Sequence, residues 1–305
     1  MFSRRQIFLL SLSPALRAAG GNADWIVALG GQVKRDASGN VTAVNLAGTW
    51  VNDSEMLDLP ALPHLERLDL SHTRISDEGL LHLKPARRIQ DLNLLYAEQI
   101  TDQGMSAIKD WKQLIRLNVR GTRIGDGTLS IVAKLSQLES LDLANTAITE
   151  NGLEGLIPLT RIKHLAIGVT RVNDGAMEVL RFLTTLESLD IGGPRGAGRN
   201  NNQRGRSTGL PEGLLRALGE LTHLKVLKAG HTPVGADELR KLAAPLAGVQ
   251  RLGLEGCSQV DDMALKELAG WRGLLYLDVQ DTAVTAAGVE ALRKQKPSLK
   301  ILHTT

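Results

Sequence analysis

Cysteine, aromatic residues and long hydrophobic runs are all scarce in this chain of 305 residues. The single cysteine, Cys257, excludes both an intramolecular disulfide framework and a cysteine-based zinc cluster. Aromatic residues make up only 3% of the sequence, so a core must be built from Leu, Ile, Val and Ala. No apolar run approaches the roughly 20 residues that a membrane-spanning helix needs. The composition therefore predicts a large aliphatic core and no membrane span.

An excess of charge of one sign is also missing from most of the chain. The 36 basic and 33 acidic residues leave a formal net charge of +3. Arg4, Arg5 and Arg17 lie in residues 1–20, which hold no acidic residue, so removing that segment leaves the rest of the chain neutral. A neutral chain has no general electrostatic attraction for polyphosphate, and we expect no nucleic-acid partner.

Signatures of catalytic and metal sites are few. There is no Walker loop and no His-Glu-x-x-His helix, and the histidines are scattered, so we expect no metal and no cofactor. Asp69 and Asp142 would lie about 14 Å apart in the stack of repeats described below. That separation exceeds the roughly 6.5–9.5 Å of an inverting pair of carboxylates. We therefore expect no enzyme and no catalytic residue, and keep a hydrolase as the minor alternative.

Residues 1–23 have the organisation of an export signal. A positive start at Arg4 and Arg5 precedes a short apolar stretch, and small residues follow up to Ala23. This order predicts a cleavable signal and a mature chain that acts in the periplasm, at the cell surface or in the medium. Residues 3–9 also resemble the twin-arginine pattern, which would imply export after folding. The alternative is a frayed amphipathic N-terminus on a cytoplasmic scaffold.

A repeat of about 24 residues organises the rest of the sequence. The pattern is (Leu/Ile/Val)-x-x-(Leu/Val)-x-(Leu/Ile/Val)-x-x-Thr-x-(Ile/Val), and residues 65–75 match it in full. It begins at Val41, Leu65, Ile89, Leu114, Leu138, Ile162, Leu186, Leu224, Val249, Leu274 and Leu299. The alternating Leu-x-Leu predicts a short strand, and Ser76 with Asp77 can cap a following helix. Because one such unit cannot bury its own apolar face, the units must stack into a solenoid.

In these motifs the chain resembles the leucine-rich repeat family, and most closely its cysteine-containing subtype. The segment from Leu252 to Cys257 fits the subtype's spacing, as does the unit that runs from Leu92 to Asp102. The resemblance covers residues 41–305. It implies an α/β leucine-rich repeat solenoid, a horseshoe with a parallel β-sheet on its concave face and helices on its convex face. It also implies binding of other macromolecules and no shared reaction.

Threonine stands in most units where that subtype has cysteine. The positions are Thr49, Thr73, Thr122, Thr146, Thr170, Thr232 and Thr282. A hydroxyl there can bond backbone groups of its own turn and of the neighbouring turn, which satisfies polar atoms buried between units. Cys257 takes the same place, so we expect it to be buried rather than reactive.

Two segments stand apart from the regular repeats. Residues 24–40 are expected to form an N-terminal cap, a short helix followed by a hairpin that covers the first strand. The repeat domain, of about ten units and a truncated last strand, then occupies residues 41–305. One spacing of 38 residues contains a basic insertion at residues 195–208, with Arg195, Arg199, Arg204 and Arg206. This segment could grip an anionic partner, or it could be a tolerated surface insertion.

Strand residues between the apolar ones would face the concave side, where equivalent positions stack about 4.8 Å apart. In units two to four these positions and the turns after them combine aromatic, Arg and His side chains, the types that dominate interface energies. We expect a binding patch of Arg67, Asp69, His72, Tyr96, Arg116, Asn118 and Arg120. The alternative is a merely solvated surface. Units six to eight are rich in glycine, which predicts a bare surface there.

These features together predict a non-enzymatic protein that acts outside the cytoplasm and binds a protein, a peptide or a glycan through its concave face. One alternative is a structural or assembly scaffold, in which the exposed C-terminal strand from Leu299 forms a weak homodimer. The binding protein described first is expected to be a monomer. Another is a cytoplasmic scaffold like the substrate receptors of ubiquitin ligases. Nothing before residue 41 resembles the helical adaptor that such a receptor needs.

Overall fold

The computed structural model describes residues 23–168, 178–193 and 210–304. The chain divides into an N-terminal unit up to Ser140 and a C-terminal unit from Leu141 onward. Nearly all of the expected export signal lies outside the described residues, and so does the basic insertion at 195–208. In the described ranges, no helix is both long and apolar enough to cross a membrane.

The N-terminal unit begins with a short helix and a hairpin. Helix α3 (Asp24–Ala28) buries Trp25 and Ile26. Strands β1 (Gln32–Arg35) and β2 (Val41–Asn45) pair in antiparallel fashion. β2 is the strand of the first repeat and pairs on its other side with the strand of the second, so β1 covers what would otherwise be a free edge.

Parallel strands in one register continue this sheet. They are β3 (Arg67–Asp69), β4 (Asp91–Asn93) and β5 (Arg116–Asn118). The middle residue of each is a buried leucine, namely Leu68, Leu92 and Leu117. Because side chains alternate along a strand, the residues on either side of each leucine lie on the opposite face. This alternation is what presents Arg67 and Asp69 to solvent while the leucines fill the core.

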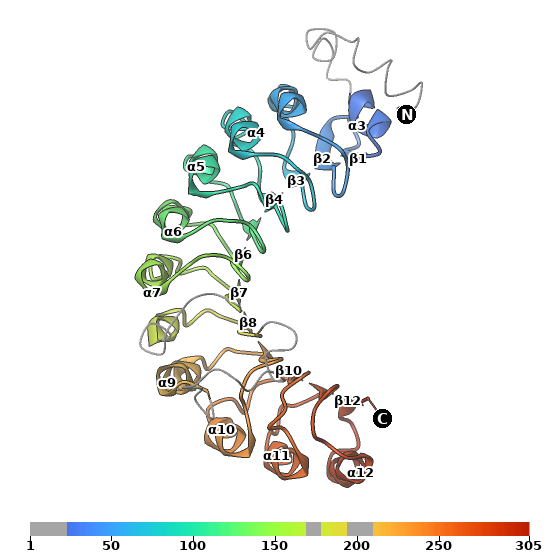
Figure 1. Ribbon diagram of the computed structural model, residues 1–305, viewed down its shortest axis with the longest axis vertical. Helices are drawn as coiled ribbons and strands as arrows, with labels where there is room; N and C mark the ends of the chain where they lie inside the picture. Colours follow the sequence, from blue (N-terminus) through green and yellow to red (C-terminus); the bar gives the residue numbers. More distant parts are fainter. Residues whose placement is uncertain (1–22, 169–177, 194–209, 305) are drawn as a thin grey trace. The chain divides into compact units, whose positions relative to one another are not determined.

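Short helices cover the leucine-bearing face of the sheet (Figure 1). They are η1 (Asp53–Leu57), η2 (Leu59–Ala61), α4 (Asp77–His82), α5 (Asp102–Met105), η3 (Ser106–Ile108) and α6 (Asp126–Val132). Ser76 caps α4, as the sequence predicted, by accepting a hydrogen bond from the Glu78 N–H at 3.2 Å. Asp53 of the preceding repeat accepts a hydrogen bond from the Ser76 backbone N–H at 2.7 Å. Neighbouring repeats are thus linked on the helical side as well as through the sheet.

The C-terminal unit repeats the same arrangement. Its parallel strands are β7 (His164–Ala166), β8 (Ser188–Asp190), β9 (Val226–Lys228), β10 (Arg251–Gly253), β11 (Tyr276–Asp278) and β12 (Lys300–Leu302). Its helices are α7 (Glu150–Leu153), η4 (Glu154–Leu156), η5 (Glu178–Phe182), α9 (Glu212–Glu220), α10 (Ala236–Leu242), α11 (Asp262–Leu268) and α12 (Ala286–Gln295). Strand β6 (Ser140–Asp142) spans the residues at which the chain divides.

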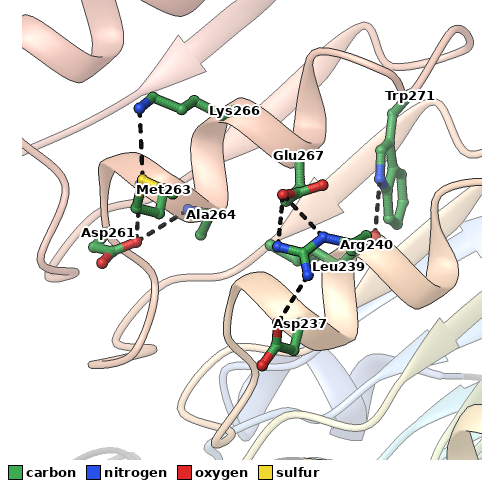
Figure 2. A network of polar contacts seen from close by, with 9 residues as sticks. All are labelled: Asp237, Leu239, Arg240, Asp261, Met263, Ala264, Lys266, Glu267 and Trp271. Atoms are coloured by element: carbon green, nitrogen blue, oxygen red, sulfur yellow. Dashed lines mark hydrogen bonds and ion pairs between the residues drawn. The ribbon is translucent and has the colours of Figure 1, made fainter.

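Side chains connect α10 to α11 on the helical side of this unit (Figure 2). The Arg240 guanidinium contacts Asp237 at 3.1 Å and Glu267 at 3.0 Å. The indole N–H of Trp271, which is fully buried, donates a hydrogen bond to the Leu239 carbonyl at 3.3 Å. Exposed ion pairs such as those of Arg240 contribute little to stability. Burial of the Trp271 ring therefore stabilises the packing of α10 and α11 more than these ion pairs do.

The threonines that end the strands bond within their own turns. The Thr73 hydroxyl donates to the Leu70 carbonyl at 2.6 Å, and Thr122 and Thr232 make the equivalent bond at the same distance. Cys257 lies fully buried in the same column, and its thiol donates to the Ala229 carbonyl of the preceding repeat at 3.1 Å. Burial raises the pKa of the Cys257 thiol to about 11. The expectation that Cys257 is buried is confirmed.

Both units therefore consist of parallel strands on one face and helices on the other, around a core dominated by leucine. This is the α/β leucine-rich repeat solenoid that the sequence predicted, and the strands lie at the Leu-x-Leu of each repeat.

Candidate functional site

The seven residues of the expected patch all lie in the N-terminal unit. They come from β3, β5 and the turns that follow β3, β4 and β5. The register sets them in three rows across the sheet. Arg67, Asp91 and Arg116 form the first row, Asp69, Asn93 and Asn118 the second, and His72, Tyr96 and Gly121 the third.

The first row alternates in charge, as the sequence predicted. Asp91 pairs with Arg116, whose Nε lies 2.8 Å from the Asp91 Oδ2. Arg67 lies on β3, on the other side of Asp91 from Arg116, and its side chain makes no ion pair within the described part of the chain. Because both members of the Asp91–Arg116 pair are partly solvated, the pair adds little to folding stability. Arg67 is therefore the cation of this row that is open to a partner.

The second row shapes the backbone. The Asp69 Oδ1 accepts a hydrogen bond from the Ser71 N–H at 2.9 Å, and its Oδ2 accepts one from Asn93 Nδ2 at 3.0 Å. The Asn118 side chain accepts from the Arg120 N–H at 3.0 Å. Equivalent residues elsewhere in both units make the same contact, namely Asn45, Asn93, Asp142, Asp190 and Asp278. Asp69 and Asn118 thus form side-chain turns at the strand ends, whatever else they contact.

The third row carries aromatic rings on an unfavourable backbone. His72 and Tyr96 have φ values of 56° and 52°, in the left-handed region where a bulky side chain is rare. Both take this conformation because their N–H groups donate to carbonyls of the next repeat, at 2.7 Å to Leu95 and 2.8 Å to Arg120. In other described repeats this position holds Gly48, Gly121, Asn145, Asp281 and a second histidine, His231.

The two rings contact each other across the surface. Their centroids lie 5.4 Å apart with an interplanar angle of 33°, and Tyr96 is 39% exposed. The Tyr96 ring also lies against Gly121 of the next repeat, where a Cβ would collide with the ring atoms Cδ1 and Cε1. The result is an exposed ladder of His72, Tyr96 and a bare glycine, which we call the aromatic ladder. Its adjacency was predicted, but its backbone strain was not.

Sequence reasoning missed a second aromatic contact in this unit. Trp50 is 74% exposed, and the Arg74 guanidinium lies 5.0 Å above the centroid of its ring. Both residues follow a strand-ending threonine, at the place between the Thr and the buried Ile or Val of the repeat. A tryptophan at a position that faces solvent in the pattern was the signal that could have identified this pair.

The remaining expected residues lie outside the described chain. These are Arg195, Arg199, Arg204 and Arg206 of the basic insertion. One Gly-x-Ser-x-Gly match, Gly205 to Gly209, overlaps the end of this insertion and also lies outside the described residues. Within the described residues, no group of three or more His, Cys, Asp and Glu side chains is arranged to hold a metal ion.

Comparison with known proteins agrees with the repeat. A family model described as Leucine Rich repeat matches residues 61–83. A sequence search among curated proteins gave no significant match. Two solved internalins from Listeria monocytogenes, inlF and inlC2, are 16% and 20% identical to this chain, with TM-scores of 0.48 and 0.43. These alignments cover 97% and 87% of this chain and 97% and 81% of the internalin chains.

A plant receptor is similar over much of the chain. The ectodomain of the Arabidopsis receptor kinase HAESA, solved in complex with an N-terminally extended IDA peptide hormone ligand, is 19% identical, with a TM-score of 0.54. The alignment covers 83% of this chain and 40% of the ectodomain. At this identity the likeness concerns the fold alone. The matched repeat and this likeness agree with the strand and helix pattern described above, which is that of a leucine-rich repeat solenoid.

Proposed function

We propose that this chain is a non-enzymatic leucine-rich repeat protein that binds a protein or peptide through the sheet face of its N-terminal unit. The observation that carries the proposal is the aromatic ladder. A non-glycine residue in the left-handed region costs about 1–3 kcal/mol. The chain places His72 and Tyr96 there in consecutive repeats and leaves both exposed, so their side chains serve a purpose other than packing.

Neighbouring groups support a macromolecular partner. Arg67 has no ion pair within the described residues, and Arg116, Arg120 and the Trp50–Arg74 pair lie in the same set of repeats as the ladder. Tyr, Trp and Arg carry most of the binding energy at protein interfaces. The peptide hormone bound to the HAESA ectodomain makes a peptide the first class of partner to test, and a glycan is the alternative.

A non-enzymatic role follows from where the carboxylates are used. Both Asp69 oxygens accept hydrogen bonds, from the Ser71 N–H and from Asn93. A carboxylate committed to these two contacts shapes the end of its strand, which supports a structural role for Asp69. Asp69 therefore gives the hydrolase alternative no support, and Asp91 is paired with Arg116.

We further propose that the protein is exported, through a cleavable signal at residues 1–23, and that residues 24–40 cap a repeat domain at 41–305. The signal-like order of residues 1–23 supports the first proposal. Membership of the cysteine-containing subtype is also a proposal, supported by Cys257 lying in the threonine column. In the same way, the basic insertion at 195–208 is proposed as a secondary contact for an anionic partner.

Affinity capture with the full chain, from the envelope and medium of the source organism, tests the binding proposal. Each captured protein would then be purified and titrated against the chain and two variants. The first variant is His72→Ala with Tyr96→Ala, and the matched control is Val27→Ala with Leu57→Ala, which removes exposed apolar groups elsewhere in the unit. Affinity lost from the first variant and kept by the control supports the proposal. Equal affinity of all three proteins overturns it.

Self-association through β12 is the second candidate function. Among the described residues, β12 pairs with β11 on one side and carries no strand on the other. A row of unpaired backbone groups at such an edge can pair with another chain. Light scattering during size-exclusion chromatography distinguishes the candidates, because a mass that stays monomeric at all concentrations excludes assembly through this edge.

A further inference from the structure

The sheet face of the C-terminal unit contains a hollow of about 840 Å³. It crosses β9, β10, β11 and β12, and its lining includes Lys228, Arg251, Gly253, Glu255, Leu275, Tyr276, Asp278 and Lys300. This volume lies within the range of about 300–1,000 Å³ that is typical of ligand sites. None of the seven residues of the expected concave patch lines the hollow.

A row of two cations and an aromatic ring forms one side of the hollow. Register places Arg251, Tyr276 and Lys300 side by side on β10, β11 and β12. The Arg251 guanidinium and the Lys300 ammonium each lie 5.9 Å from the centroid of the Tyr276 ring. Neither cation has an ion pair within the described residues, whereas Lys225 on the same face pairs with Glu187 at 2.7 Å. The Arg251 guanidinium and the Lys300 ammonium thus both contact the Tyr276 ring, and their N–H groups remain available as hydrogen-bond donors.

Gly253 has no side chain, and this absence leaves open space in the hollow. Gly253 lies between Lys228 and Asp278 in the register, so the cation of β9 meets no side chain on β10. A Cβ at Gly253 would lie 3.0 Å from a Glu255 carboxylate oxygen and 3.7 Å from the Lys228 Cα. The Glu255 carboxylate also lies against Gly230 of the preceding repeat. Glu255 and Asp278 therefore line the hollow as acceptors together with the cations, and the Asp278 Oδ1 already accepts a hydrogen bond from the Gln280 N–H at 3.0 Å.

The geometry points to an extended acidic peptide segment as the ligand of this hollow, which we propose as a second binding site beyond the surface in the N-terminal unit. Carboxylate side chains of the peptide pair with Arg251, Lys300 and Lys228, and an apolar side chain packs on Leu275, which is 53% exposed. Four strands about 4.8 Å apart span about 14 Å, and an extended chain crosses that distance with about four residues.

The two acceptors favour a peptide over a nucleic acid. Backbone N–H groups of a peptide can donate to Glu255 and Asp278, whereas the sugar-phosphate backbone of a DNA oligonucleotide has no donor for these carboxylates. The neutral charge of the chain beyond residue 20 also gives no long-range attraction for polyphosphate. An oligonucleotide is accordingly the competitor that distinguishes the two classes.

Fluorescence anisotropy with the full chain and a fluorescein-labelled Gly-Glu-Leu-Glu-Leu-Glu-Gly peptide tests the site. We expect Arg251→Gln with Lys300→Gln to weaken binding by at least about tenfold, because two charge-assisted hydrogen bonds are lost. Arg272→Gln with Lys294→Gln removes the same charge from exposed positions outside the hollow and should change the affinity by less than about twofold. The peptide with Gln in place of Glu should bind as weakly to wild type as the acidic peptide binds to the first variant.

A steric variant makes the test independent of charge and of folding defects. Gly253→Leu adds a side chain inside the hollow, where only the flexible ends of Glu255 and Lys228 need to move, and should also weaken binding by about tenfold. Circular dichroism of each variant checks that the fold is kept. The His72→Ala/Tyr96→Ala variant should bind the peptide like wild type, so this proposal and the proposed function fail separately. The proposal is overturned if Arg251→Gln/Lys300→Gln and Arg272→Gln/Lys294→Gln lose the same affinity. It is also overturned if wild type binds the Gln peptide as tightly as the acidic peptide, or if an oligonucleotide of the same charge competes equally well.

Discussion

The ring of Tyr96 lies directly against the backbone of Gly121 in the next repeat, where there is no room for a Cβ. Gly121 itself has a φ of 72°, in the left-handed region. Two separate constraints therefore meet at this glycine. One is the left-handed conformation of the turn, and the other is the contact with the exposed Tyr96 ring of the preceding repeat.

Gly121→Ala is expected to lower the free energy of unfolding by about 1–2 kcal/mol and to displace the Tyr96 ring. Urea denaturation measures the loss. In a Tyr96→Ala background the same change should cost less, because only the strain of the left-handed alanine remains. Gly219→Ala on α9 is the control, since a Cβ there meets no atom within 4 Å, and it should leave stability unchanged or raise it. Equal costs in the two backgrounds would contradict the contact between the ring and the glycine.

Asp69→Ala should lower stability by about 1–2 kcal/mol, since the N–H of the buried Ser71 loses its acceptor. Asp69→Asn keeps an oxygen in that place and should cost clearly less. Chemical denaturation of both variants measures the difference, and the same pair then separates folding from binding. If Asp69→Asn binds a partner as wild type does while Asp69→Ala does not, the carboxylate shapes the turn and takes no part in recognition. Equal stability of the two variants would mean that the turn does not depend on this side chain.

Repetition explains why the fold could be predicted from the sequence. Leu68, Leu92 and Leu117 recur at one spacing, and a strand with a single buried residue at its centre has only one register that keeps every leucine in the core. The adjacency of His72 and Tyr96 followed from the same register. These predictions needed only the period and the alternation of side chains along a strand.

Features that depend on one repeat differing from its neighbours were not predicted. The left-handed conformation of Tyr96 is invisible in the pattern, because glycine fills that position in only some repeats. The hollow of the C-terminal unit depends on Gly253 lacking a side chain beside Lys228 and on where the Glu255 carboxylate lies. The bare surface predicted for units six to eight did not include Gly253, which belongs to the ninth unit and leaves room beside the charged side chains. Both features depend on contacts between residues at different positions of neighbouring repeats. The residue types found at one repeat position do not predict such contacts.

Cys257 gives a prediction for the effect of pH. Burial, the main cause, raises the pKa of its thiol from 9.0 to about 11, so the folded chain resists ionisation that the unfolded chain allows. A group with a raised pKa stabilises the fold fully below its unfolded pKa and loses that contribution as pH rises. Stability should therefore fall between about pH 9 and about pH 11, by up to about 2–3 kcal/mol from this group. Denaturation of wild type and of Cys257→Thr at both ends of this range isolates the thiol, because other titrating groups are common to both. The variant should lose less stability, and parallel losses would contradict the burial of the thiol.

Trp50 is distinguished from the other three tryptophans by its exposure. Trp25, Trp111 and Trp271 are buried, whereas Trp50 is 74% exposed and lies beneath the positive charge of Arg74. Iodide, an anionic quencher, should therefore reach one component of the tryptophan fluorescence and leave the rest. Trp50→Phe should remove that component with a change in stability within about 0.5 kcal/mol, since an exposed ring buries little surface. Arg74→Gln should keep the component but weaken its quenching, because the local positive charge that concentrates iodide is gone. Acrylamide, which is neutral, should quench wild type and Arg74→Gln alike, and a smaller effect of acrylamide on the variant would indicate that the ring had moved rather than that its charge environment had changed.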